Sequence, residues 1–205
     1  MTLWLTDSRS VDSRTLDSRM DWLSASEAAR YRRFIRPQRQ RQFLLGRILL
    51  RIALAELLGI ETSGIALAER PGNAPALIGI VPVPAFSIAH SGHWVACAVS
   101  TDTPLGLDIE VRNSERDLAA LARQAFSRKE ADALAKLDGE ARVRTFYELW
   151  SRKEAAYKLI STLPTGERHS PHFTTLAHPD LSIVVCSAHA AVRITLRDPL
   201  HHLHS

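Results

Sequence analysis

Apolar positions recur at helical spacing in the first third of the chain. Ser24 and Glu27 have the separation of a capping box, which predicts a helix that begins there and runs to about Ile35, before Pro37. Proline suits the first turn of a helix, so a second helix is expected from Pro37 to Gly59. The apolar face of this second helix consists of Leu44, Ile48, Ile52, Ala55 and Leu58.

The pattern changes between residues 65 and 111, where short β-prone runs alternate with glycine and proline. Helical periodicity then returns, and the segment 161–180, rich in proline, threonine and histidine, is expected to be a loop. The expected strands lie near 65–69, 77–80, 85–89, 94–100, 105–111, 181–188 and 191–196, and the expected helices cover 117–124, 127–137 and 140–160.

A short internal similarity suggests that the chain consists of two related halves. The run Val95–Val99 is similar to Val184–Ala188, and each run follows a helical region. We therefore predict an α+β protein with two similar halves, residues 1–104 and 105–205, divided near Pro104. Chance similarity is the alternative, because the matching runs are short.

Composition limits the class of protein without identifying it. The 205 residues carry a net charge of +4 and are 45% hydrophobic and 23% charged, as in an ordinary globular protein. The apolar runs are far shorter than the roughly 20 residues of a membrane span, and the first residues lack the pattern of a secretory signal. Two cysteines cannot form a disulfide framework, so the expected compartment is the reducing cytoplasm.

Positive charge is concentrated in one stretch. Between Glu27 and Glu56 the chain has no acidic residue, which indicates a surface for phosphates, nucleic acid or an acidic protein. A solvated helix face is an equally good interpretation of this stretch by itself. The basic residues in it are Arg30, Arg32, Arg33, Arg36, Arg39, Arg41, Arg47 and Arg51.

Two carboxylates lie close together in the strand expected over 105–111. Strand alternation places Asp108 and Glu110 on one face, where their charges repel unless a cation lies between them. A magnesium ion satisfies this arrangement, and a third carboxylate from a helix, Glu154, would leave room for a diphosphate. Lys153 and Lys158 could then neutralise phosphate oxygens. For the carboxylate pair alone, a solvated strand end that binds nothing is the alternative.

A polar turn follows the strand expected over 85–89. His90 and Ser91, with the amides of the turn around Gly92, form a candidate anion site. A histidine in such a turn can equally serve only the turn itself. His90 and His93 are also spaced as H-x-x-H, but zinc is not expected, because neither a C-x-x-C pair nor an H-E-x-x-H helix accompanies them.

Together, three segments resemble the Sfp-type 4′-phosphopantetheinyl transferases. They are Phe86–Gly92, Gly106–Glu110 and Phe146–Lys158. The last segment carries the spacing W-x-x-K-E-x-x-x-K, which begins at Trp150 and is a specific signature of that family. The resemblance covers roughly residues 26–160, with weaker support for the final strands.

The resemblance implies an enzyme that moves the phosphopantetheine arm of coenzyme A onto a serine of a carrier protein and releases adenosine 3′,5′-bisphosphate. It also implies that coenzyme A and Mg²⁺ (or Mn²⁺) bind between the two halves. The implied metal ligands are Asp108, Glu110 and Glu154. Glu154 would be the base for the carrier serine, directly or through a metal-bound water. Asp108, Glu154 and Lys158 are the implied catalytic residues, and Lys158, His90, Ser91, Arg30, Arg33, Arg41 and Lys153 are the implied coenzyme-binding residues.

The implied partner is an acidic carrier domain, which a basic face would attract, and the implied enzyme is a monomer without a nucleic-acid partner. Two departures from the family pattern concern coenzyme binding: Ala89 replaces a serine, and Ala74 stands where a lysine is frequent, so Arg70 is the candidate substitute. Three other functions stay open from the residues: a nucleic-acid-binding module, a carrier-binding protein without activity, and a magnesium-dependent phosphohydrolase.

Overall fold

The computed structural model describes residues 1–163, 170–190 and 193–199. Its helices are α1 (Ser13–Asp17), α2 (Ala25–Arg32), α3 (Pro37–Leu58), α4 (Leu118–Ala125), α5 (Arg128–Ala135) and α6 (Gly139–Ile160). Its strands are β1 (Thr2–Asp7), β2 (Ala66–Ala68), β3 (Ala76–Ile78), β4 (Ala85–Ser91), β5 (Trp94–Ser100), β6 (Leu105–Val111), β7 (His172–Leu176), β8 (Leu181–Ser187) and β9 (Thr195–Arg197).

The two larger sheets share one plan. In the first sheet the order is β4-β5-β1-β9, and in the second it is β7-β8-β6. In each, the central strand (β5 or β8) pairs antiparallel with a strand that precedes a 22-residue helix (β1 before α3, β6 before α6) and with one that follows it. The internal similarity noted in the sequence falls on β5 and β8, so the expected α+β fold with two similar halves is confirmed.

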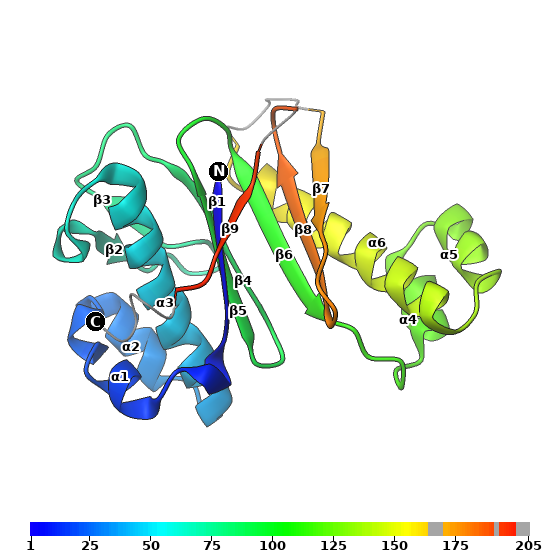
Figure 1. Ribbon diagram of the computed structural model, residues 1–205, viewed down its shortest axis with the longest axis horizontal. Helices are drawn as coiled ribbons and strands as arrows, with labels where there is room; N and C mark the ends of the chain where they lie inside the picture. The colour runs from blue at the N-terminus through cyan, green and yellow to red at the C-terminus, as the bar shows by residue number, and fades with distance from the viewer. Residues whose placement is uncertain (164–169, 191–192, 200–205) are drawn as a thin grey trace.

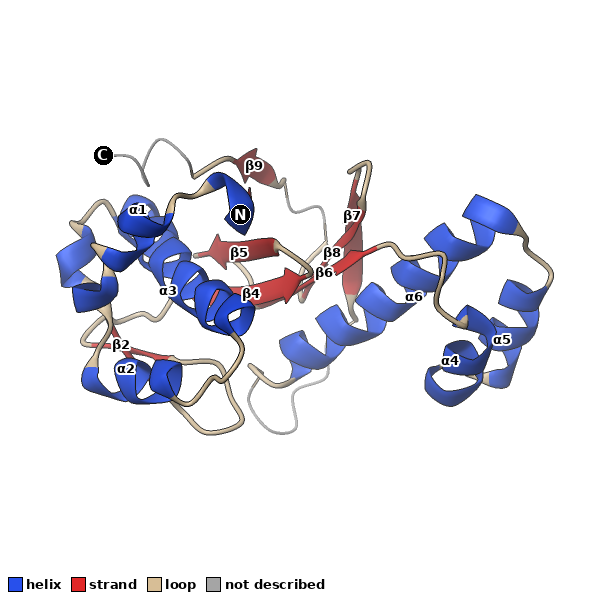
Figure 2. Ribbon diagram, turned by 90° about the horizontal axis from the view of Figure 1, so that it is seen from below, coloured by secondary structure: helices blue, strands red, loops and turns tan. Residues whose placement is uncertain are grey.

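The layers follow from which faces are apolar. Helix α3 covers the outer face of the first sheet, and α6 covers the outer face of the second (Figures 1 and 2). The inner faces of both sheets meet in a shared core that includes Leu3, Ala96, Leu107 and Ile183. Gly106 allows α6 to approach β6, because a Cβ there would overlap the carbonyl oxygen of Ala155.

Serine hydroxyls join the two halves at the seam between β4 and β6. The amide of Leu107 donates to Ser87 Oγ, and the amide of Val111 donates to Ser91 Oγ, both at 3.0 Å. These bonds satisfy backbone groups of β6 that no neighbouring strand of the second sheet reaches on that side. The seam therefore brings the turn at the end of β4, which is the candidate anion site, against the strand that carries Asp108 and Glu110.

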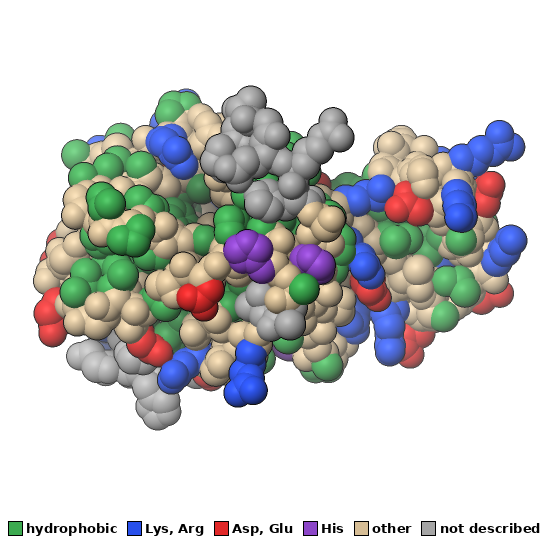
Figure 3. Space-filling view, turned by 90° about the horizontal axis from the view of Figure 1, so that it is seen from above, with side chains coloured by type: hydrophobic (Ala, Val, Ile, Leu, Met, Phe, Trp, Pro, Cys, Tyr) green, Lys and Arg blue, Asp and Glu red, His purple; other side chains and the backbone are tan. Residues whose placement is uncertain are grey.

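A small helical unit extends from the second sheet. The first half of α6 continues beyond the strands and packs on α4 and α5 through Phe126, Leu134, Phe146 and Tyr147. Seen from above, the surface at this end shows basic and acidic side chains interspersed (Figure 3). In the described part of the chain, no helix has the length and apolarity that a membrane crossing requires.

Most expected elements lie within a few residues of their predicted bounds, with five differences. The short helix α1 was not expected. The strand expected near 191–196 begins on residues outside the described part of the chain, and β9 covers Thr195–Arg197. Strand β1 was not expected, because four of its six residues are buried in a row and the usual polar alternation is absent. Strand β7 interrupts the expected loop; it is a polar edge strand with a weak pattern. Helix α2 ends at Arg32 rather than at Ile35. The division of the chain into halves at residue 104 stays a prediction. Strand β9, from the end of the chain, pairs with β1 and so belongs to the first sheet.

Candidate active site

A cleft of about 290 Å³ lies where the last turns of α6 meet the first half. Three residues singled out from the sequence line it: Arg30 from α2, His90 from β4 and Lys158 from α6. The cleft is also lined by residues that sequence reasoning missed, above all Arg39, Phe43 and Tyr157. In the sequence, Arg39 was only one arginine among eight and Tyr157 only one position within the segment Phe146–Lys158, while Phe43 had no signal. The loop Gly72–Pro75, which lacks the lysine of the family pattern, forms one wall, with Arg70 donating to the Ala74 carbonyl.

Lys158 connects this cleft to a buried carboxylate. Its ammonium donates to Asp108 Oδ1 and to the carbonyl oxygen of Leu107, both at 2.9 Å. Asp108 is only 5% exposed, and burial raises its pKa to about 6 although the Lys158 charge opposes the rise. Its second oxygen, Oδ2, is buried and accepts no hydrogen bond of ordinary geometry within the described residues, although the nearby hydroxyl of Ser151 acts to lower the pKa of Asp108. One face of this carboxylate is therefore available for a further positive group.

Glu110 lies on the same strand, beside the seam. The Ser91 hydroxyl donates to its Oε2 at 2.7 Å, so Ser91 positions a carboxylate rather than lining the cleft. Burial raises the pKa of Glu110, and the nearby negative charge of Glu154 adds to the rise. Glu154 is half-buried on α6. The carboxylate of Glu154 is therefore near enough to Glu110 for its charge to act on the pKa of that residue.

The three carboxylates do not form a closed ligand set as their side chains stand. In residues 1–163, 170–190 and 193–199, no three His, Cys, Asp or Glu side chains gather closely enough to hold a metal ion. Asp108 is turned to Lys158, and Glu110 is turned to Ser91. The donor chemistry nevertheless suits a hard cation, because the set offers carboxylate oxygens and includes the unpartnered Asp108 Oδ2.

His90 is a neutral base at the rim of the cleft. The surrounding protein desolvates its ring, and the charges of Arg39 and Lys158 add to that effect, so its pKa is lowered to about 4. Its Nε2 accepts a hydrogen bond from the Arg39 guanidinium. Arg39 has no ion-pair partner within the described residues, and burial and the nearby charges of Arg30 and Arg47 lower its pKa. This crowding of positive charge favours an anionic ligand.

The basic stretch is only partly a surface. Arg47 and Arg51 are buried on α3 and pair with Glu27 and Glu69, at N–O distances down to 2.5 Å. Arg30 also pairs with Glu69, at 2.5 Å. The expectation of one continuous basic surface, or of one solvated helix face, is therefore wrong for Arg47 and Arg51. Sequence reasoning missed this because the two glutamates lie at or beyond the ends of the stretch.

Besides Ser91, three implied coenzyme-binding residues do not line the cleft. Arg41 donates to the carbonyl oxygens of Ser8 and Val11, and so fastens the segment after β1 to α3. Lys153 pairs with Glu130 of α5 at 3.1 Å. Arg33 is exposed just after α2 and does not line the cleft.

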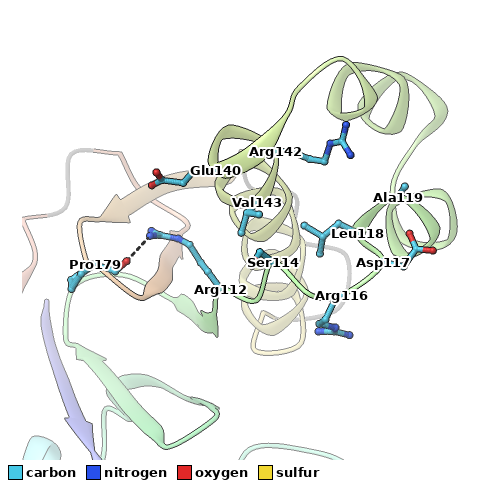
Figure 4. A pocket seen from close by; sticks show the side chains of 11 residues that line it. Arg112, Ser114, Arg116, Asp117, Leu118, Ala119, Glu140, Arg142, Val143 and Pro179 are labelled. Atoms are coloured by element: carbon cyan, nitrogen blue, oxygen red, sulfur yellow. Dashed lines mark hydrogen bonds between the residues drawn. The ribbon is translucent and has the colours of Figure 1, made fainter.

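A larger hollow, of about 660 Å³, lies between the loop after β6, the start of α6 and the turn before β8 (Figure 4). Two of the arginines that line it are already hydrogen-bonded within the fold. Arg112 donates to the carbonyl oxygens of Pro179 and Leu181, and Arg142 donates to Leu137 and Asp138. Arg116, Arg142 and Arg112 point in different directions in Figure 4. Although this hollow is larger, the side chains that line it do not converge on a common point, so the smaller cleft is the stronger candidate for the active site.

Comparison with known proteins gives matches in both halves. Residues 104–198 match the family model described as the 4′-phosphopantetheinyl transferase superfamily, and residues 11–102 match the model of a 4′-phosphopantetheinyl transferase N-terminal region. A 4′-phosphopantetheinyl transferase of Bacillus subtilis is 29% identical over 197 residues, which are 84% of this chain and 85% of that protein. HetI, a 4′-phosphopantetheinyl transferase of Nostoc, is 32% identical over 66% of this chain and 58% of HetI. A Synechocystis protein whose name assigns it provisionally as a 4′-phosphopantetheinyl transferase is 35% identical over 66% of this chain and 56% of its own length. The chain therefore spans little more than half the length of the Nostoc and Synechocystis relatives.

Proposed function

Because the chain belongs to the 4′-phosphopantetheinyl transferase superfamily, we propose that it transfers the 4′-phosphopantetheine arm of coenzyme A to a serine hydroxyl of an apo carrier protein, releasing adenosine 3′,5′-bisphosphate. The observation that carries the proposal is Lys158. This one ammonium lines the cleft between the halves and pairs with the buried Asp108. Phosphoryl-type transfer depends on such positioning and charge stabilisation more than on covalent catalysis.

Three groups are proposed to hold the phosphates of coenzyme A. Lys158 contacts the diphosphate, and His90 and Arg39 meet phosphate oxygens at the rim. Arg39 replaces Arg33 and Arg41 in this role, since it lines the cleft with no carboxylate paired to it in the described residues. Arg30 is less available to a ligand, because it already pairs with Glu69, which also pairs with Arg47. The phosphates would offset the mutual repulsion of these cations.

Asp108, Glu110 and Glu154 are proposed to hold a divalent cation, Mg²⁺ or Mn²⁺. Three carboxylates suit such an ion, and the raised pKa values of Asp108 and Glu110 reflect negative charge that is buried without sufficient compensation. When bound, the ion would draw negative charge from the diphosphate as the bisphosphate leaves. The orphaned Asp108 Oδ2 is the oxygen with the most to gain from it.

Glu154 is proposed to accept the proton of the carrier serine. The serine oxygen forms a bond to the β-phosphorus, which carries the pantetheine arm, while the bond from that phosphorus to the bridging oxygen breaks. The bridging oxygen leaves on adenosine 3′,5′-bisphosphate, and the serine proton passes to the Glu154 carboxylate or through water to it. Lys158 stabilises the charge that develops on the diphosphate.

Incubation with coenzyme A, Mg²⁺ and a panel of apo carriers from fatty-acid, polyketide and peptide synthetases tests the proposal. Intact-mass spectrometry should show an increase of about 340 Da on at least one carrier, the mass of the transferred arm. A magnesium-dependent phosphohydrolase would instead cleave coenzyme A with no carrier present. Unchanged carrier masses across the panel would refute the transfer.

We also propose that the enzyme is a monomer of the cytoplasm. One chain supplies both walls of the cleft, so no second copy is required to complete it. Both cysteines are buried and unpaired, which suits a reducing compartment. Light scattering coupled to gel filtration measures the oligomeric state.

A further inference from the structure

The segment from the last residue of α2, Arg32, to Arg36 before α3, called here the 32–36 loop, presents an apolar side chain among cations. Ile35 is 96% exposed. Arg32, Arg33 and Arg36 surround it in the sequence and are exposed as well. None of these three arginines forms an ion pair within the part of the chain that the structure describes. An isoleucine in this position contributes almost nothing to the hydrophobic core.

The 32–36 loop is held in one shape. The ring of Phe34 packs on Phe43, with centroids 5.3 Å apart. The Phe34 carbonyl accepts a hydrogen bond from Gln40 Nε2 at 2.9 Å, and the Arg36 carbonyl accepts one from the Arg39 amide at 2.9 Å. Ile35 is therefore presented by an ordered backbone, which reduces the entropy that a partner would have to overcome on binding.

The 32–36 loop also adjoins the candidate active site. Phe43, on which Phe34 packs, lines the cleft. The guanidinium of Arg39 lies over the Phe34 ring at 5.3 Å and contacts His90 at the cleft rim. A protein seated on this loop would thus lie beside the place where coenzyme phosphates are proposed to bind.

Three arginines of α5 and α6 differ from those of the 32–36 loop. On α5 and α6, Arg128, Arg144 and Arg152 each pair with an acidic residue one helical turn away. Charges of both signs are interspersed on that surface (Figure 3). The 32–36 loop has positive charge without such compensation, together with an apolar centre, which is the composition of an interface anchor with a charged rim.

We infer that the 32–36 loop is a docking element for the acidic carrier protein, with Ile35 inserted between apolar side chains of the carrier helices and Arg32 and Arg36 facing its carboxylates. This inference rests on the proposed transfer function. A nucleic-acid backbone fits the surface less well, because phosphates would engage the arginines but leave the isoleucine in water. An acidic carrier protein can contact both the arginines, through its carboxylates, and Ile35, through its apolar side chains.

Steady-state kinetics with a carrier that the parent enzyme modifies tests the docking. Ile35→Asp should raise the KM for the carrier at least about tenfold, with kcat and the KM for coenzyme A within about twofold. Arg36→Glu should raise the carrier KM at low salt, and the difference should shrink as ionic strength rises. The matched controls are Ile60→Asp, at the far end of α3, and Arg128→Glu, on α5; both should leave the carrier KM unchanged.

The outcomes separate this inference from the proposed function. If the parent modifies carriers and Ile35→Asp binds and modifies them as the parent does, the docking inference is wrong while the transfer function stands. Equal losses in the two control variants would also overturn it. If the parent modifies no carrier and binds none in titration calorimetry, both ideas fail. Binding of single-stranded RNA that Arg36→Glu abolishes and carrier does not compete with would replace the carrier by a nucleic acid.

Discussion

At the scale of single residues, the candidate active site contains titratable groups whose charged forms are disfavoured by burial or by neighbouring charges. Asp108 is buried with one oxygen on Lys158 and the other without a partner, and His90 is kept neutral beside two cations. Such groups destabilise the free protein and become favourable once a ligand of opposite charge arrives. Substitution of either residue should therefore separate stability from activity.

Asp108→Asn should leave the protein at least as stable as the parent at pH 8 while reducing transfer at least about 100-fold. The pKa of Asp108 is raised to about 6 from 3.8. Because the folded pKa is the higher one, ionisation of Asp108 costs stability as pH rises from about 4 to about 6, and the cost is complete above pH 6. A shift of this size corresponds to roughly 2–3 kcal/mol.

Thermal unfolding of the parent and of Asp108→Asn at pH 8 and at pH 4 measures this cost. The advantage of the variant should be present at pH 8 and disappear at pH 4. A melting temperature several degrees below the parent at pH 8 would contradict the assignment of Asp108 as an under-compensated charge.

His90 should titrate near pH 4 in the free protein, and its pKa should rise by at least about one unit when coenzyme A saturates the cleft. Bound phosphate favours the protonated ring, so the sign of the change reports negative charge next to it. NMR titration of the imidazole signals follows the ring, and His90→Gln identifies its resonance. A pKa that does not move on addition of coenzyme A would place the phosphates elsewhere.

At the scale of elements, the close contact between α6 and β6 sets the position of the site. Lys158 and Glu154 reach the strand carboxylates only because Gly106 lets the helix lie against β6, where a Cβ would be 2.6 Å from the Leu159 amide nitrogen and overlap the Ala155 carbonyl oxygen. The neighbouring Ala155 is fully buried in the same contact. The glycine is thus a packing requirement of the helix that carries the signature.

Gly106→Ala should lower the stability by at least about 2 kcal/mol, because the added methyl group must move α6 or β6. For a chain of this length the melting temperature should fall by roughly 4–8 °C, and transfer should fall with it as Lys158 shifts from Asp108. Gly64→Ala is the control, since a Cβ there meets only an ordinary contact of 3.5 Å. Equal melting temperatures for the two variants would show that the contact is looser than described.

At the scale of the whole molecule, the cleft exists because two similar halves pack with their sheets face to face. One half supplies Arg39, His90 and the loop Gly72–Pro75, and the other supplies Lys158 and the carboxylates. A ligand that contacts both sides should stabilise the assembly of the two halves.

Coenzyme A at 100 times its dissociation constant should stabilise the protein by about 2.7 kcal/mol, a rise in melting temperature of roughly 5–10 °C. Lys158→Ala should lose most of this rise, since it removes the cation that contacts the diphosphate. Scanning fluorimetry with and without the ligand measures both values. A variant that gains as much as the parent would remove Lys158 from the coenzyme site.

The sequence by itself determined the local structure and the candidate chemistry of this protein. The capping box of Ser24 and Glu27, Pro37 and Gly59 mark helix ends as expected. The motifs D-x-E and W-x-x-K-E-x-x-x-K identified Asp108, Glu110, Glu154 and Lys158 as candidate site residues. These signals are short-range, because they depend on spacing within one strand or one helix.

Only the tertiary structure decided which charges are free. Glu69 pairs with Arg30 and Arg47, and Glu27 pairs with Arg47 and Arg51, while Arg39 lines the cleft without a paired carboxylate in the described residues. Likewise β1 could not be recognised, because its pairing with β5 and the burial of its side chains against residues of α3 and of the second sheet depend on segments remote from it in the sequence. Ion pairing and burial depend on contacts between remote segments, and local spacing carries no information about them.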